Sequence, residues 1–322
     1  MIGADSPPLD RMRSLHPLLK AALWRLGSAL LVMWLAASAT FVALHALPGR
    51  IQDILAGDLE LPGLKEAISA EWGLDRSLPE QYLDYIVRIA HGDFGSSYVM
   101  RQPVSSIIGS QVLPTVTLAL LAGALAALIA FTLATLTAGR PGPARRLAAL
   151  LELGSASVPV FWLGILLLMA FSFRLPWFPV SGDAGWRALV LPTITLALPT
   201  AGILTQVLRE AMEKALEQPF VTTVRARGLG ELGLRLHHVL RHALLPAVTL
   251  GGWLVGSLLG GAVITEKVFG RPGLGTVTLN AVLSQDVPVV LAVVLLAAFV
   301  YVLVSTALDL LYLAIDPRLQ NQ

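Results

Sequence analysis

The amino-acid sequence predicts an all-α integral membrane protein with six transmembrane helices and an external segment between the first and the second. Of its 322 residues, 55% are hydrophobic and only 14% are charged, whereas soluble domains carry about 25% charged residues. Six separate stretches are each predominantly apolar over about 20 residues, the length that crosses a bilayer as a helix. The net charge of +2 indicates no nucleic-acid partner, and the absence of cysteine excludes disulfides, thiol catalysis and Cys-ligated metals.

The six predicted spans cover residues 26–47, 112–138, 147–173, 188–208, 243–265 and 287–308. A basic arm, residues 1–25, precedes the first span, as it would in a signal peptide. The apolar run that follows is longer than a signal core of about 7–15 residues, so we expect an uncleaved first transmembrane helix. The chain therefore divides into the arm 1–25, the first span 26–47, a segment 48–111 and a five-helix core 112–322.

A proline-containing motif recurs along the chain, as LPTVTL at 113–118, LPTITL at 191–196 and LPAVTL at 245–250. Proline has no backbone N–H and suits the first turn of a helix, where that donor would be unpaired anyway. Each copy therefore predicts the start of a span. We interpret the recurrence as convergent helix-start chemistry, with a weak internal duplication as the alternative.

Lysine and arginine orient the spans, because short cytoplasmic loops are enriched in them. Basic residues gather in the N-terminal arm, in the turn with Arg140, Arg145 and Arg146, and in the loop 209–243, which all share one side if the chain starts in the cytoplasm. The segment 48–111 is acidic instead, with nine Asp and Glu against five Lys and Arg. We therefore expect both termini and the loop 209–243 in the cytoplasm, and the segment 48–111 outside.

The interiors of the spans contain almost no Asp, Glu, Lys or Arg, apart from Glu152 near the cytoplasmic end of the third. A secondary transporter usually needs a titratable or ion-coordinating residue at mid-membrane, so this pattern argues against one. Most of the polar residues in the spans suit close packing of helices. As candidates for lining a polar passage we take Ser155, Ser157, Thr200, Gln206, Thr249 and Ser257.

The sequence provides no ATPase site and no enzyme motif of its own. A phosphate-binding loop requires a Gly-Lys pair, whereas each lysine of this chain follows Leu or Glu. The metalloprotease motif HExxH and the hydrolase motif GxSxG do not occur in the sequence either. We therefore expect no catalytic residue, cofactor or metal in this chain, and the energy for uphill transport would have to come from another chain.

The loop 209–243 is too polar to span the membrane and carries a distinct pattern. In QPFVTTVRARG, Pro219 suits the first turn of a helix and Gly228 the left-handed position that ends one, which predicts a short helix over 218–229. The apolar spacing that follows predicts an amphipathic helix with a basic face, on the membrane surface or on a partner. The alternatives are a solvated basic loop and, less favoured, a metal site at His238 and His242.

Several stretches, in order along the chain, resemble one family. They are FGSSYVMRQPV at 94–104, SASVPVFWLGILLLMAFS at 155–172, VRARGLG…HHVLRHALLP at 224–246, EKVFGRPGLGTVTLNAVLSQDVPVV at 266–290 and ALDLLYLAIDPR at 307–318. Together they resemble the permeases of binding-protein-dependent ABC importers, and among these the peptide/nickel (dipeptide/oligopeptide) subfamily. The resemblance covers nearly the whole chain.

This resemblance implies a type I ABC importer permease fold in the cytoplasmic (inner) membrane of a bacterium. Two homologous permeases, expected to be a heterodimer, would form a pore for di- or oligopeptides. Two ATP-binding subunits would use ATP and Mg²⁺ below it, and an extracytoplasmic substrate-binding protein would deliver substrate above. The helix at 218–229 would be the coupling helix that docks on the ATPase and drives alternating access. The implied contact residues are Phe220, Val221, Thr222, Arg225, Ala226, Gly228 and Leu229.

The sequence departs from the family pattern at three places. Pro48-Gly49-Arg50-Ile51 stands where a Pro-Gly-Asp-Pro-like run is common, Gln285-Asp286-Val287-Pro288 where Arg-Asp-Tyr-Pro is common, and Thr222-Thr223 where the wider motif has Glu-Ala. The substrate class is therefore open, and a permease for nickel or a metal–metallophore chelate is the close alternative. A stand-alone secondary transporter or channel, and a membrane-anchored assembly factor, are alternatives of a different class.

Overall fold

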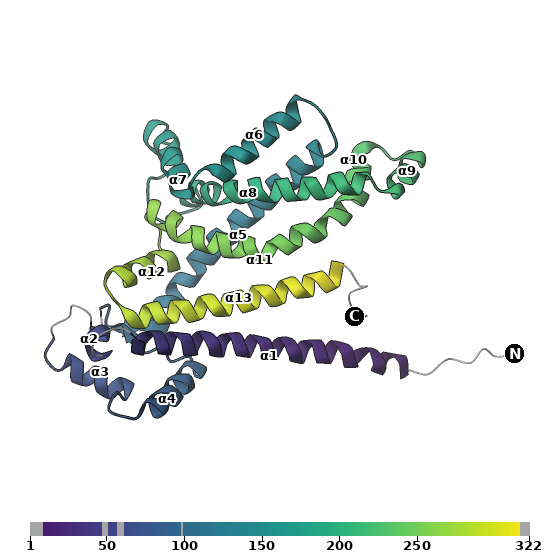
Figure 1. Ribbon diagram of the computed structural model, residues 1–322. Helices are drawn as coiled ribbons and strands as arrows, with labels where there is room; N and C mark the ends of the chain where they lie inside the picture. The colour runs from purple at the N-terminus through teal and green to yellow at the C-terminus, as the bar shows by residue number, and fades with distance from the viewer. Residues whose placement is uncertain (1–8, 47–50, 57–60, 98, 316–322) are drawn as a thin grey trace.

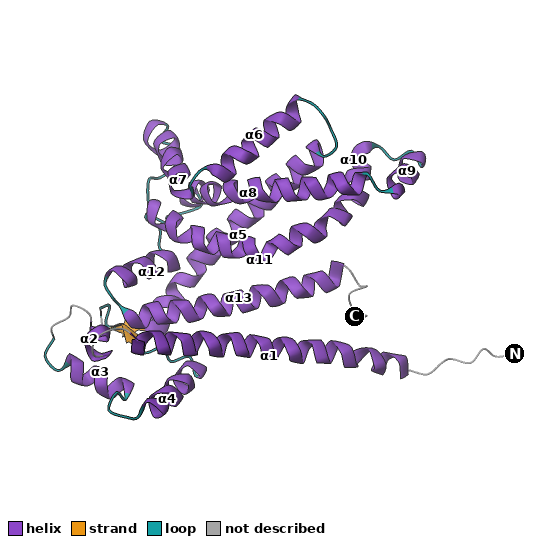
Figure 2. Ribbon diagram, in the orientation of Figure 1, coloured by secondary structure: helices purple, strands orange, loops and turns teal. Residues whose placement is uncertain are grey.

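The computed structural model describes residues 9–46, 51–56, 61–97 and 99–315. The long helices are α1 (Leu9–Ala46), α5 (Val104–Thr137), α8 (Arg187–Leu216), α11 (Leu240–Val268) and α13 (Val287–Ile315). The shorter ones are α2 (Ile51–Ala56), α3 (Leu64–Trp72), α4 (Leu78–Ala90), α6 (Pro143–Ser157), α7 (Val160–Leu168), α9 (Pro219–Ala226), α10 (Glu231–Leu234) and α12 (Leu274–Leu283), with π-helical turns η1 (Met169–Arg174) and η2 (Arg235–Val239). One antiparallel hairpin pairs β1 (Ser96–Ser97) with β2 (Gln102–Pro103), as Figure 2 shows.

The predicted spans fall on α1, α5, the pair α6–α7, α8, α11 and α13. Four helical segments are long and apolar enough to cross a membrane, namely Trp24–Ala46, Val104–Thr137, Arg187–Leu216 and Val287–Leu308. The prediction of an all-α, multi-span protein is therefore confirmed. Residue 47 and residues 1–8 of the predicted arm lie outside the described residues, while residues 9–25 of that arm already belong to α1.

The proline motifs lie inside helices and not at their starts. Pro114 is within α5, Pro192 within α8 and Pro246 within α11, so the prediction that each motif begins a span is wrong. Membrane helices tolerate an internal proline when neighbouring helices or small local adjustments satisfy the carbonyl that it frees. Each helix therefore begins before its motif. For example, α5 begins at Val104, directly after Pro103 and nine residues before its motif at 113–118.

The third predicted span is not one straight helix. α6 and α7 meet at an angle of 105°. Val158 between them is extended and Pro159 caps α7, because proline removes a helical donor and disfavours the helical conformation of the residue before it. The expectation of a continuous helix over 147–173 is therefore corrected to a broken one, with Ser155 and Ser157 just before the break.

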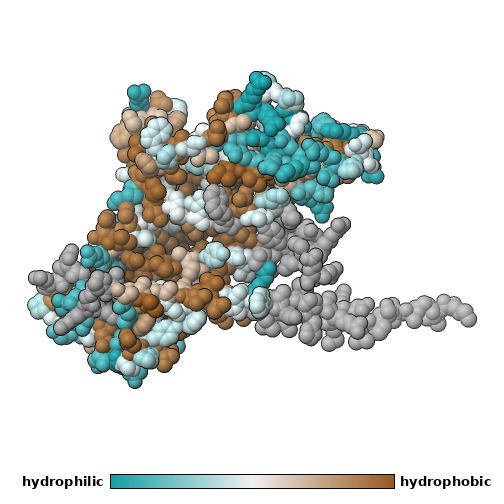
Figure 3. All heavy atoms as spheres, viewed as in Figure 1, coloured by the Kyte–Doolittle hydropathy of each residue, from teal (hydrophilic) through white to brown (hydrophobic). Residues whose placement is uncertain are grey.

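The helices form an elongated bundle with different elements at its two ends (Figure 1). The helices α2 to α4 and the hairpin lie at one end, and α9 and α10 lie at the other, where α1 begins and α13 ends. The space-filling view shows hydrophobic residues over the middle and hydrophilic residues gathered over the α9–α10 end and over the α3–α4 end (Figure 3). This distribution is the one expected of a bundle that crosses a membrane.

The central element of the bundle is α8. In the most apolar part of α8, 61% of the residues are buried inside the structure, whereas the corresponding share is 22% for α5 and for α13 and 11% for α1. It packs against α5, α6, α7 and α11. One hydrophobic cluster joins α5, α8 and α11 in the middle, with Leu118, Leu196 and Leu258, and another joins them to the α9–α10 loop. A shift of α8 would therefore reach most of the core.

Candidate functional site

The predicted short helix of the polar loop is present as α9. Gln218, before it, is extended, Pro219 occupies the first helical turn, and the chain leaves at Gly228 with a φ of 80°. This left-handed conformation carries almost no strain for glycine but is unfavourable for residues with a Cβ. Pro219 and Gly228 thus fix where α9 begins and the direction in which the chain leaves it.

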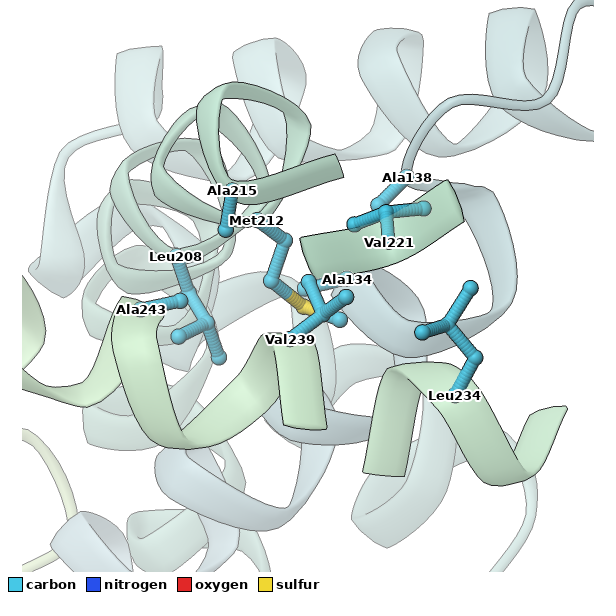
Figure 4. Close-up of a cluster of buried hydrophobic side chains, with 9 residues drawn as sticks. All are labelled: Ala134, Ala138, Leu208, Met212, Ala215, Val221, Leu234, Val239 and Ala243. Atoms are coloured by element: carbon cyan, nitrogen blue, oxygen red, sulfur yellow. The ribbon is translucent and has the colours of Figure 1, made fainter. Parts of the chain in front are cut away.

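A hydrophobic cluster holds α9 against the ends of three long helices. Val221 is only 2% exposed and packs in one cluster with Leu208 and Met212 of α8, Val239 of η2 and Leu234 of α10. Figure 4 shows this cluster, in which Met212 points toward Val239. Fully burying a valine side chain stabilises by about 1.5–3 kcal/mol. The helix is therefore held by a buried side chain in a cluster that the end of α8 shares, and it is not a solvated loop.

The other residues predicted for coupling lie around this anchor. Thr222, Arg225, Ala226, Gly228 and Leu229 are exposed, and Phe220 is half-buried. The Phe220 ring lies on the His242 ring, with centroids 4.8 Å apart. Val221 was predicted together with the contact residues, but its side chain faces the core. In this conformation it holds the helix in place and offers no surface to a partner.

A group of charged side chains surrounds the exit from α9. Arg225 donates to Glu231 from Nε at 2.8 Å and from Nη2 at 3.4 Å. The Arg235 Nη2 atom lies 3.6 Å from the same carboxylate. The hydrogen bond from Arg225 holds the pKa of Glu231 below its usual value, while burial lowers the pKa of Arg235. The sequence pattern had identified Arg225 but neither Glu231 nor Arg235.

A buried ion pair joins α6 to α8. Arg209 donates to both oxygens of Glu152, at 2.5 and 2.6 Å, and the two side chains are 10% and 1% exposed. Two turns before Arg209, Gly202 packs so closely on α6 that an added Cβ would lie 2.7 Å from the Glu152 backbone oxygen. The sequence showed Glu152 as an isolated acid in a span. Its partner, 57 residues away, could not be identified from spacing.

The six candidates for lining a passage lie in different surroundings. Ser157, Gln206, Thr249 and Ser257 are exposed in the single chain. Thr200 is buried and its hydroxyl donates to the Leu196 carbonyl, while Ser155 is half-buried and donates to the Glu152 carbonyl. Hydroxyls bonded to their own helix suit packing. The four exposed residues are therefore the ones that remain accessible to a passage.

At the opposite end, the carboxylate of Glu266 holds the first turn of α12. It accepts from the Thr115 hydroxyl at 2.5 Å and from the backbone N–H groups of Gly275 and Thr276 at 2.8 and 3.1 Å. A Cβ on Gly273 or on Gly275 would collide with this carboxylate. The PGLG stretch is therefore glycine-rich because a buried acid occupies the side-chain space, and it ties α12 to α5 and α11.

The hairpin is tied to the loop between α12 and α13. Ser97 donates to Asp286 at 2.5 Å, and the Ser97 hydroxyl accepts from the Met100 backbone N–H. Asp286 is 2% exposed, and burial raises the pKa of its carboxyl group. Two of the stretches that resemble the family, 94–104 and 266–290, are thus in direct contact. Among the described residues no three His, Cys, Asp or Glu side chains come together as a metal site.

This fold and this anchored loop helix define a class of membrane protein, and comparison with known proteins identifies it. The chain belongs to the family of binding-protein-dependent transport system inner membrane components, whose sequence profile matches residues 130–321. It is thus a permease of the ABC importer class and a multi-pass inner membrane protein. The predicted family, the peptide subfamily of importer permeases, is confirmed.

Individual relatives make the placement more specific. The chain is 34% identical to a putative peptide transport system permease protein of Brucella suis over 92% of this chain and 97% of the relative. It is also 34% identical to the glutathione transport system permease protein GsiC of Salmonella typhimurium, over 94% and 99%. Among solved structures it is similar to the inward-facing MetNI methionine ABC transporter, with a TM-score of 0.51 at 18% identity, over 65% of this chain and 96% of that one. The last likeness supports the predicted type I importer fold.

Proposed function

We propose that this chain forms half of the translocation pore of an ATP-driven importer of di- and oligopeptides, glutathione-like peptides included. α9 would be the coupling helix that docks on a separate ATPase subunit. The observation that carries the proposal is the anchoring of α9. This helix of eight residues has exposed polar groups on its outer surface, and its Val221 is buried in the cluster that includes Leu208 and Met212 at the end of the central helix α8.

Such an anchor would transmit force in both directions. If an ATPase moved α9 on closing, the buried cluster that contains Val221 together with Leu208 and Met212 would carry the displacement into α8. Packed cores respond as rigid bodies because they have little free volume. α8 in turn holds α6 through the ion pair of Glu152 and Arg209. A change at the ATPase could thus reach the walls of the bundle and shift it between two pore states.

The expected partners follow from the family. They are a second, homologous permease, two ATP-binding subunits and an extracytoplasmic substrate-binding protein, with ATP and Mg²⁺ used by the ATP-binding subunits. The four exposed polar candidates, Ser157, Gln206, Thr249 and Ser257, would face the passage or the second permease. The α9 end would lie in the cytoplasm together with both termini. The peptide substrate is supported by the names of the two relatives, one a peptide and the other a glutathione permease.

Uptake measurements test the substrate. In a strain lacking the chain, plasmid-borne protein should restore uptake of radiolabelled di- and tripeptides or glutathione, and should not restore uptake of chelated nickel. Restoration of nickel uptake alone would favour the nickel or metallophore alternative. Restored uptake of any substrate without an ATP-binding subunit would contradict an ATP-driven importer.

Substitutions in the α9 loop test coupling. Arg225→Glu reverses the charge of an exposed side chain, and Gly228→Pro forbids the φ of 80°. Both should abolish uptake and separate ATP hydrolysis from transport, while the protein still assembles in the membrane. Arg146→Glu, an equal charge change on exposed Arg146 at the start of α6, is the control and should retain most uptake. Normal uptake in the Arg225→Glu and Gly228→Pro variants would contradict the coupling role of α9.

A further inference from the structure

Glu231, the first residue of α10, is shared by two arginines of very different burial. Arg225, on α9, is 50% exposed and holds both oxygens of Glu231. Arg235, one helical turn after Glu231, is only 4% exposed, and its Nη2 atom lies 3.6 Å from the Glu231 Oε2 atom, beyond hydrogen-bond length. Its Nε and Nη1 atoms are buried and have no hydrogen-bond partner among the described residues. The exposed arginine thus makes hydrogen bonds to a carboxylate with which the buried arginine makes only an ion pair at 3.6 Å.

The free energies of exposed and buried ion pairs favour the opposite arrangement, in which Glu231 is hydrogen-bonded to the buried arginine. An exposed ion pair contributes little to stability, because water already solvates both charges. A buried cation whose N–H groups are not hydrogen-bonded is costly, because those groups have lost their hydration without replacement. Arg140 and Arg225 add like charge near Arg235, and the pKa of Arg235 is lowered by burial first and by these neighbours second. Glu231 would therefore stabilise the loop more if it were bonded to Arg235.

The geometry lets Glu231 change partner with little movement. Glu231 and Arg235 are four residues apart on one helical stretch, with the acid N-terminal, which is the favourable order for such a pair. The Arg235 Nη2 atom is only slightly too far away to donate. What keeps Glu231 in place is its pair of hydrogen bonds with Arg225, whose side chain is exposed on the coupling helix.

We propose that docking of the ATPase switches the hydrogen-bond partner of the Glu231 carboxylate from Arg225 to Arg235. A carboxylate on the ATP-binding subunit pairs with Arg225, and the released Glu231 rotates to hydrogen-bond the buried guanidinium. This inference rests on the proposed coupling role of α9 and adds to it the chemistry of the partner and the intramolecular response. Arg235 begins η2, whose Val239 packs in the same cluster as Val221. Docking would therefore also tighten the contact between the loop and the core.

A double-mutant cycle on thermal stability tests the carboxylate sharing in the absence of the ATP-binding subunit. Arg225→Ala and Glu231→Gln are made singly and together, and unfolding is followed in the purified permease pair in nanodiscs. If Glu231 passes to Arg235 when Arg225 is gone, Glu231→Gln should lower the melting temperature at least as much in the Arg225→Ala background as in the wild type. If Glu231→Gln has no effect in that background, Glu231 serves Arg225 alone and the inference is overturned.

Binding of the purified ATP-binding subunit to the same nanodiscs tests the switch of Glu231 from Arg225 to Arg235 itself. In the wild-type background, Glu231→Gln should weaken binding, because docking no longer satisfies Arg235. In an Arg235→Gln background, Glu231 only competes with the incoming carboxylate, so Glu231→Gln should strengthen binding. We expect about threefold in each direction, within the range of an exposed ion pair. An equal effect of Glu231→Gln in both backgrounds would overturn the inference, whereas a wild-type pair that binds no ATP-binding subunit would contradict the proposed function instead.

Discussion

The ion pair of Glu152 and Arg209 is a residue-scale feature that should be costly to disrupt by removing one partner. Its two hydrogen bonds join α6 to α8 where both side chains are nearly inaccessible to water. Removing one partner of a buried pair leaves a charge without compensation and costs about 3–5 kcal/mol, whereas replacing both by apolar residues is often neutral. We therefore expect Glu152→Leu and Arg209→Met each to lower the melting temperature strongly, and the double variant to recover most of the loss.

Thermal unfolding of the purified protein checks this prediction. The control is Glu210→Ala, one residue further along α8, which removes an exposed i,i+4 pair with Lys214. Such pairs contribute about 0.2–0.5 kcal/mol, so the control should unfold near the wild-type temperature. If the double variant is no more stable than either single variant, the uncompensated charge is not the cause of the loss. The polar groups of Glu152 and Arg209 would then be needed for stability themselves.

At the scale of elements, the close packing of α6 on α8 depends on a single glycine. A Cβ on Gly202 would lie 2.5 Å from the Ser155 hydroxyl oxygen and 2.7 Å from the Glu152 backbone oxygen, so Gly202→Ala must push the two helices apart. We expect this variant to lose about 1–3 kcal/mol of stability, by the usual cost of overpacking. Gly154→Ala on α6 is the matched control, because nothing lies within 4 Å of its added Cβ. Calorimetry that finds both variants equally stable would contradict the packing described for these helices.

The elements also show how far the sequence alone could lead. Apolar length located the four helical segments that are long and apolar enough to cross a membrane, because the bilayer imposes that length on each helix separately. Pro219 and Gly228 located α9, because they act on the local backbone. The same local reasoning misplaced the helix starts at Pro114, Pro192 and Pro246, where packing by neighbouring helices overrides the preference of proline.

Side-chain partners were not predictable in the same way. Glu152 with Arg209, Glu266 with Thr115 and Ser97 with Asp286 are pairs that join residues 57, 151 and 189 positions apart. Only the packed arrangement of the helices brings such residues together. The burial of Val221 is a similar case, since a short helix in isolation gives no indication of which face its neighbours will cover.

For the whole molecule, we predict that the two ends of the bundle lie on opposite sides of the membrane. The helices α2 to α4 lie at one end, and α9 lies at the other, with the start of α1 and the end of α13 (Figure 1). The enrichment of Lys and Arg in cytoplasmic loops predicts that the α9 end lies in the cytoplasm. Because the chain has no cysteine, single cysteines can report this orientation without background labelling. We choose Leu83→Cys on α4, where the side chain is 62% exposed, and Lys214→Cys near the end of α8, where it is 73% exposed.

We expect a membrane-impermeant maleimide to label Leu83→Cys in intact spheroplasts, and to label Lys214→Cys only after the membrane is permeabilised. Labelling of both variants after permeabilisation is the control for accessibility, and uptake by each variant shows that it is assembled. The reverse pattern in spheroplasts would place α9 outside the cell, where it could not meet a cytosolic ATPase, and the coupling role of α9 would then be untenable. The expected pattern would place the acidic α2–α4 segment where an extracytoplasmic binding protein can reach it, and it would put the charge network of Arg225, Glu231 and Arg235 on the side where ATP is hydrolysed.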